Sequence, residues 1–267
     1  MRNDVDMRSG MCKYVWYVAL WCVTTIVLSA PFSAWAQSER AVRYEIEGGI
    51  LGTRNMEIHG YEQGNATEDW KSTNPTARFE YWSVKKDQWN YGVIAQPLYA
   101  HYSDNLTSDL NYDGEVYYKG EHGTLDYQFH SVRGTANYTL LGRDEEHRYL
   151  RGGGSLIARY AEVNFKTESG SFHDTNFIAF PLLNLESEFE LYDGYVFFTR
   201  GDFLPSIDGN VFLDGLFDVI FALRRYVDSE SSVDVGIRLF FGGYDPNKPD
   251  DYANRIFFNG AVVRYCW

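Results

Sequence analysis

Long runs in which apolar and charged residues alternate constrain this chain more than any other feature of its sequence. In the first run, one set is apolar or small and the other mostly charged: Val42, Tyr44, Ile46, Gly48 and Ile50 against Arg43, Glu45, Glu47 and Gly49. The same period of two returns over residues 183–191, 211–224 and 233–241. Because alternate side chains of a β-strand point to opposite faces, each run predicts a strand with one apolar and one charged face.

The length of these runs separates two all-β architectures. Strands of soluble sandwiches usually have about five or six residues, whereas the run over 211–224 is more than twice as long. A tilted strand of about 9 to 11 residues crosses a membrane, and closure pairs every backbone group that lipid cannot hydrogen-bond. We therefore expect a closed antiparallel transmembrane β-barrel, with a soluble secreted β-sandwich as the alternative.

The connections between the runs supply a second test of the barrel. Ten strands are predicted, over residues 42–53, 76–85, 89–102, 124–141, 148–166, 177–192, 194–205, 210–226, 231–244 and 255–267. Short turns alternate with longer polar segments along most of the chain, and only the short loop at 206–209 departs from this rule. Outer-membrane barrels have short periplasmic turns and longer outer loops. Ten strands, with eight or twelve as alternatives, would place both termini on the periplasmic side.

The N-terminus predicts an export signal. Arg2, Arg8 and Lys13 precede an apolar run that ends in Ala34-Trp35-Ala36, the small-x-small pattern of a signal-peptidase site. We expect a signal peptide over 1–36 and a barrel domain over 37–267, with an uncleaved anchor as the alternative. The mature net charge would be (24 − 3) − (37 − 2) = −14, which argues against nucleic acid as a partner. Only Cys266 would remain, so no internal disulfide is expected.

The last strand carries a resemblance to a known class of proteins. Its final residues, Tyr265 and Trp267, resemble the terminal aromatics of bacterial outer-membrane β-barrel proteins, although Val262 stands where their glycine usually lies. The resemblance implies a location in the bacterial outer membrane, contact with its lipids and lipopolysaccharide, and recognition by the barrel-assembly machinery through Tyr265 and Trp267. Further aromatic residues near strand ends suit interfacial girdles, namely Tyr44, Tyr81, Trp82, Trp89, Tyr99, Tyr117, Tyr195, Tyr226 and Tyr265.

The charged faces supply candidates for the barrel interior. These are Arg43, Glu45, Glu47, Arg78, Glu80, Asp126, His130, Arg159, Glu186, Glu188, Glu190, Asp214, Asp218, Arg224 and Arg238. A barrel of eight to ten strands has a narrow lumen, and buried charges persist when they are paired, so a salt-bridged plug is the first interpretation. A narrow porin is the alternative, with Glu186, Glu188 and Glu190 as a strip that favours cations.

One short motif predicts chemistry instead. If the strand over 89–102 turns its apolar face to lipid, parity places His101 and Ser103 on that face at the outer rim. With Glu115 downstream, they resemble the His-x-Ser and Glu arrangement of outer-membrane lipid A 3-O-deacylases. The resemblance implies Ser103 as nucleophile, His101 as base and Glu115 as orienting acid, acting on an ester-linked acyl chain. It departs from that family in its place far from the C-terminus and in Asp104, where asparagine is usual.

No cofactor or metal is expected, because the six histidines lack ligand spacing and the acidic residues of 245–251 suit a solvated loop. The sequence thus favours a structural or surface-interaction barrel with a largely plugged lumen and an unidentified extracellular ligand. A lipid A esterase and a narrow porin are the two alternatives.

Overall fold

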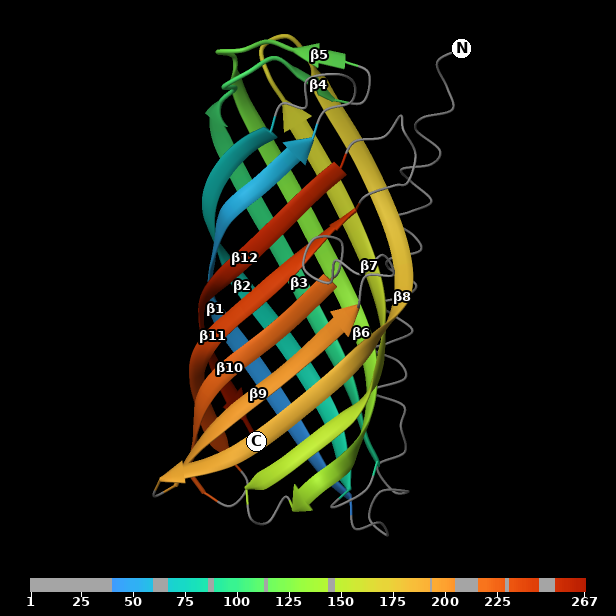
Figure 1. Cartoon of the computed structure of the whole chain (residues 1–267), viewed down its shortest axis with the longest axis vertical. Coiled ribbons are helices and arrows are strands. Elements are labelled where there is room, and N and C mark those ends of the chain that lie inside the picture. Colours follow the sequence, from blue (N-terminus) through green and yellow to red (C-terminus); the bar gives the residue numbers. More distant parts are fainter. Residues whose placement is uncertain are drawn as a thin grey trace. The chain divides into compact units, whose positions relative to one another are not determined.

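The computed structural model describes residues 40–59, 67–85, 89–112, 115–143, 147–192, 194–204, 216–228, 231–244 and 253–267. Ten strands of this part close into one antiparallel barrel (Figure 1). They are β1 (Arg40–His59), β2 (Thr67–Lys85), β3 (Trp89–Asn105), β6 (His122–Arg143), β7 (Arg148–Lys166), β8 (Ser171–Tyr192), β9 (Tyr195–Leu204), β10 (Leu216–Tyr226), β11 (Ser232–Tyr244) and β12 (Ala253–Cys266). The predicted fold and strand number are confirmed, whereas the predicted signal peptide lies outside the described residues.

The strand order shows how the barrel closes. Around the wall it is β1-β12-β11-β10-β9-β8-β7-β6-β3-β2. The first and last strands meet through reciprocal hydrogen bonds: the Tyr44 amide donates to the Trp267 carbonyl at 2.8 Å, and the Trp267 amide donates to the Tyr44 carbonyl at 3.0 Å. Because the sheet closes on itself, it presents no unpaired edge to its surroundings.

The two ends of the barrel differ in their connections, and we call them the turn end and the loop end. At the turn end, where β1 begins and β12 ends, short connections include Gly142 and Gly194, whose φ angles of +77° and +79° suit glycine. The loop end carries most of the longer connections, and one of them contains a hairpin of β4 (Leu110–Tyr112) and β5 (Glu115–Tyr117). The predicted alternation of connections is therefore present, while residues 210–215 of the predicted strand 210–226 lie outside the described part.

The side-chain pattern reverses between the two ends. Near the turn end, Glu45 and Glu47 are buried inside while Ile46 faces outward. Near the loop end of β6, apolar residues point inward and polar ones outward: Leu125, Tyr127 and Phe129 alternate with Asp126, Gln128 and His130. The apolar outer surface nearer the turn end, which we call the apolar belt, does not extend to this height. The outer faces of the strands therefore meet solvent there, and their inner faces form a core. The prediction that Asp126 and His130 point into the interior is wrong for this reason.

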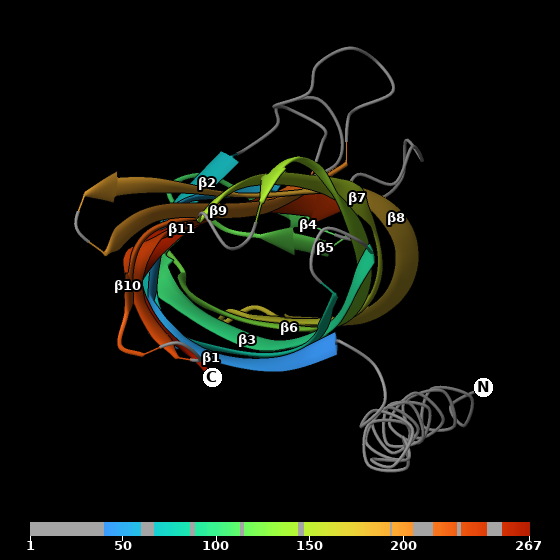
Figure 2. The ribbon, with the colours of Figure 1, turned by 90° about the horizontal axis from the view of Figure 1, so that it is seen from below.

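An apolar core fills the loop end between opposite walls. Phe129 on β6 and Phe240 on β11 contact one another with ring centroids 6.3 Å apart, although these strands are not neighbours. Leu110 and Tyr117 of the β4–β5 hairpin are buried in the same cluster. Seen along the barrel, the hairpin lies within the ring of strands (Figure 2). The buried Glu68 carboxylate fixes this loop by accepting hydrogen bonds from the backbone amides and hydroxyls of residues 107 and 108.

Part of the predicted aromatic girdle is present at the turn end. Tyr44 and Tyr265 face outward, and both stack on the ring of Trp267, at 5.8 and 5.4 Å. Trp82 and Tyr117, however, are buried inside the barrel, and their assignment to a girdle is wrong. Trp82 has the inward parity of Glu80 on β2, and Tyr117 belongs to the β4–β5 hairpin, which contributes to the apolar core.

Candidate functional site: the charged interior

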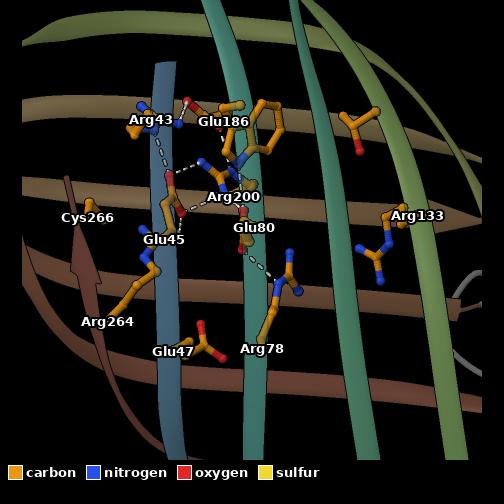
Figure 3. Close-up of polar contacts among 12 residues, drawn as sticks. Arg43, Glu45, Glu47, Arg78, Glu80, Arg133, Glu186, Arg200, Arg264 and Cys266 are labelled. Atoms are coloured by element: carbon orange, nitrogen blue, oxygen red, sulfur yellow. Dashed lines mark hydrogen bonds and ion pairs between the residues drawn. The ribbon is translucent and has the colours of Figure 1, made fainter. Parts of the chain in front are cut away.

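A network of ion pairs occupies the interior near the turn end (Figure 3). Its arginines are Arg43, Arg78, Arg133, Arg151, Arg200, Arg224, Arg238 and Arg264, and its acids are Glu45, Glu47, Glu80, Glu186, Glu188, Asp202, Asp218 and Asp234. All are buried except the partly buried Arg43. The eight positive and eight negative charges balance, and each group has at least one partner of opposite sign.

Arg200 joins three strands through three carboxylates. Its Nε donates to Glu186 Oε2 at 2.6 Å on the neighbouring β8, and its Nη1 lies 3.1 Å from Glu45 Oε2 on β1. The same Nη1 also pairs with Glu80 on β2. Because β1 and β2 lie across the barrel from β9, this one guanidinium connects opposite walls.

Asp218 organises a second layer of the network, nearer the loop end. Its Oδ2 accepts hydrogen bonds from Arg78 at 2.9 Å and from Arg133 at 3.0 Å, while its Oδ1 accepts from Arg238. Arg238 in turn donates to both oxygens of Glu47, at 2.7 and 2.6 Å. Three arginines around one carboxylate compensate for its removal from water.

Aromatic rings complete the packing of the network. The guanidinium carbon of Arg200 lies 4.4 Å from the Trp82 ring centroid, and those of Arg224 and Arg264 each lie 4.2 Å from that of Phe198. A ring face attracts a cation and fills the space beside a planar guanidinium. The rings of Trp82 and Phe198 thus contact three guanidinium groups of the network.

The predicted strip of three glutamates is not continuous. Glu186 and Glu188 are buried and paired with Arg151 and Arg224, but Glu190 is exposed at the turn end. The prediction that all three glutamates lie in the interior is therefore wrong for Glu190. The tertiary structure brings arginines of other strands to Glu186 and Glu188. Strand parity alone does not reveal these pairs.

Several members of the network were missing from the predicted interior: Arg133, Arg151, Arg200, Asp202, Asp234 and Arg264. A sequence signal for them exists, since each has the same parity as buried neighbours of its own strand. Among the predicted interior residues, Asp214 lies outside the described part of the chain.

The rim motif occurs where parity placed it, on the outward face of β3 towards the loop end. The His101 side chain is 51% exposed, and its Nδ1 lies 2.7 Å from Asp126 Oδ1. The Tyr99 hydroxyl donates to the same oxygen at 2.7 Å. Partial burial favours the neutral acid, but the hydrogen bonds from His101 and Tyr99 hold the pKa of Asp126 below its ordinary value. His101 is therefore oriented by an acid that the motif did not include.

Ser103 contacts a different histidine from the one predicted. Its Oγ lies 3.0 Å from Nε2 of His122, whose Nδ1 lies 3.1 Å from Oδ1 of Asn105. Glu115 begins β5, and its carboxylate lies beside Gly170 in the loop between β7 and β8. Within the described residues, no hydrogen bond joins Ser103 to His101 or to Glu115. His122 lies on the adjacent strand, 19 residues from Ser103, so the short sequence motif did not include it.

Comparison with solved structures finds similar outer-membrane proteins. The outer-membrane protease OmpT from Escherichia coli is similar, with a TM-score of 0.51, 13% sequence identity, and coverage of 85% of this chain and 96% of that chain. The transport unit of the autotransporter AIDA-I from Escherichia coli has a TM-score of 0.45 and 9% identity, covering 90% of this chain and 94% of that chain. The attachment invasion locus protein Ail of Yersinia pestis has a TM-score of 0.32 and 13% sequence identity, covering 83% of this chain and 97% of that chain.

No protein-family model matches the sequence, and no curated protein matches it significantly. Likeness at such low identity concerns the fold and not the activity. The described part of this chain forms a closed ten-stranded antiparallel barrel with the fold of bacterial outer-membrane β-barrel proteins.

Proposed function

We propose that this protein is an outer-membrane barrel of structural or surface-interaction type whose lumen is closed to ions. The observation that carries the proposal is the pairing of Arg200 with carboxylates across the barrel. Every charge of this network has a partner of opposite sign, so the network itself offers no free fixed charge to a permeating ion, and the apolar core at the loop end adds a second barrier.

In this proposal the apolar belt faces outer-membrane lipid, with the turn end in the periplasm and the loop end facing lipopolysaccharide and an extracellular ligand. The exposed Tyr265 and Trp267 side chains stay on the outer surface of the closing strand. They would be available to the barrel-assembly machinery before β12 pairs with β1. Export through a cleaved signal peptide over 1–36 belongs to the same proposal.

Planar-bilayer conductance of the folded protein tests the closed lumen. We expect no steady channels from the wild type. The variant Arg200→Ala, which removes the cross-wall connection, should conduct if it remains folded, as checked by the gel shift between unheated and boiled samples. Steady wild-type conductance that changes on substitution of Glu186 or Glu188 would favour the narrow porin instead.

A second candidate function is ester hydrolysis at the rim, favoured by the contact between Ser103 and His122. Asn105 accepts the Nδ1 proton of His122, which leaves Nε2 free to accept the proton of Ser103. The Ser103 oxygen would form a bond to the ester carbonyl carbon, the alcohol would leave with the proton from His122, and water would then release the acyl group. An ester-linked acyl chain of lipid A is the substrate that this position at the membrane surface suggests.

Mass spectrometry of lipid A, from membranes that contain equal amounts of each variant, tests this second function. Loss of one acyl chain with the wild type and with His101→Gln, but not with Ser103→Ala or His122→Gln, would support it. Dependence on His101 and not on His122 would restore the base predicted from sequence. Unchanged lipid A with all variants would exclude the esterase while leaving the closed barrel untouched.

A further inference from the structure

Arg159 is the exception among the buried arginines of the barrel. It lies on β7, paired with Ser131 of β6 and Ile178 of β8. Every other buried arginine has a carboxylate within ion-pair distance, but among the described residues none lies that close to Arg159, and its guanidinium makes no hydrogen bond there. Because the network below it is neutral, Arg159 carries a positive charge that no carboxylate of the described residues compensates.

Aromatic rings surround the Arg159 guanidinium. Its central carbon lies 4.9 Å from the ring centroid of Phe129, 5.4 Å from that of Phe240 and 5.8 Å from that of Phe180. These rings hold the cation by their faces but offer no hydrogen-bond acceptor. Among the described residues, no acceptor therefore uses the N–H donors of this guanidinium.

The guanidinium also borders space that solvent reaches. Arg159 is 5% exposed, and its nitrogens are not among the fully enclosed side-chain atoms that lack a partner. Ile178, directly paired with Arg159 and so on the same face of the sheet, is 37% exposed. The guanidinium thus lies at the border between packed rings and the partly exposed position of Ile178.

We propose that Arg159 binds the carboxylate of a small organic acid whose apolar body lies against Phe129, Phe180 and Phe240. A guanidinium and a carboxylate match in charge and in the spacing of two parallel hydrogen bonds. A single cation among phenyl rings suits a monoanion with an apolar body, whereas a phosphate dianion normally requires several donors. The site lies where the charged network meets the apolar core at the loop end, to which Phe129 and Phe240 belong, and it is independent of the rim residues.

Titration calorimetry with benzoate and hexanoate, on the folded barrel in a non-ionic detergent, tests the proposal. We expect binding by the wild type, at least a tenfold loss of affinity in Arg159→Met, and a smaller loss in Arg159→Lys. The matched control is Arg225→Met, which removes an equal charge from an exposed position of β10 and should bind like the wild type. Inorganic phosphate should bind more weakly than benzoate.

Asp214→Asn provides the decisive second variant, since Asp214 is the acid of residues 210–215 whose parity in the sequence matches that of the buried Asp218. Binding that appears only after this substitution would mean that Arg159 serves an internal ion pair, and the proposal would be overturned. Absence of binding by both proteins, or wild-type affinity retained in Arg159→Met, would also overturn it. The gel shift on heating shows whether each variant is folded.

Discussion

Arg78 on β2 and Asp218 on β10 form a buried ion pair of 2.9 Å between opposite walls of the barrel. A slip of either strand by one residue would turn its charged face towards the outer surface and leave the partner charge unpaired inside. An uncompensated buried charge costs several kcal/mol. The interior network therefore specifies the register of strands that never contact one another through their backbones.

Replacing Arg200 by methionine should strongly destabilise the barrel, because three buried carboxylates then lose a shared partner. We expect the free energy of unfolding to fall by about 3 to 5 kcal/mol. Urea unfolding in phospholipid vesicles, followed by tryptophan fluorescence, measures the change. Arg225→Met, at an exposed position, is the control and should stay within about 0.5 kcal/mol of the wild type. Equal stability of the two variants would show that the Arg200 pairs contribute little.

The Glu47 and Arg238 side chains should be energetically coupled, since two hydrogen bonds of 2.7 and 2.6 Å join them. A double-mutant cycle with Glu47→Gln and Arg238→Met should give an interaction energy of about 1 to 3 kcal/mol. Urea unfolding of the four proteins provides the values. Additive effects of the two substitutions would contradict a stabilising contact between these groups.

The absence of a side chain at Gly92 makes room for the Trp82 ring, which packs beside the Arg200 guanidinium. A Cβ at Gly92 would lie 2.6 Å from Cε3 of Trp82, whereas a Cβ at Gly48 would meet no atom within 4 Å. We expect Gly92→Ala to lower the free energy of unfolding by about 1 to 3 kcal/mol through overpacking. Gly48→Ala is the matched substitution and should be nearly neutral. Similar losses from both would place the cause in the backbone and not in the Trp82 ring.

His147, in the turn before β7, should make stability depend on pH. Its Nδ1 lies 3.7 Å from Glu188 Oε2, and this contact raises the pKa of His147 above the ordinary 6.5, with burial opposing the rise. A raised pKa stabilises the folded state below the ordinary value, and this contribution is lost as pH rises through the folded value. The free energy of unfolding should thus fall between about pH 6 and pH 8, by less than about 1 kcal/mol because the ring is 39% exposed.

The variant His147→Gln should remove this part of the pH dependence, as measured by urea unfolding at the two pH values. His173→Gln, which removes an exposed histidine at the loop end, should leave the pH dependence intact. If the free energy of unfolding fell by the same amount in both variants and in the wild type, the pH dependence would come from other groups.

Much of the barrel could be predicted from local sequence. A period of two and the length of the alternating runs predicted ten antiparallel strands, and the structure contains them. Near the turn end, the predicted outward face of Ile46 and inward face of Glu47 are confirmed. At Asp126, which was predicted to point inward, the side chain lies on the outer face. Alternation identifies two faces, but which one is the inside depends on whether lipid or water lies outside at that height.

The sequence by itself determined the fold class, since a strand's alternation is a local property of its own residues. Tertiary structure decided which charges meet, because Arg200, Glu45 and Glu80 approach one another only after distant strands close the ring. The tertiary structure also decided that Ser103 contacts His122 and that the Arg159 guanidinium lies among phenyl rings. Such contacts depend on the register and curvature of the whole barrel, which no single strand encodes.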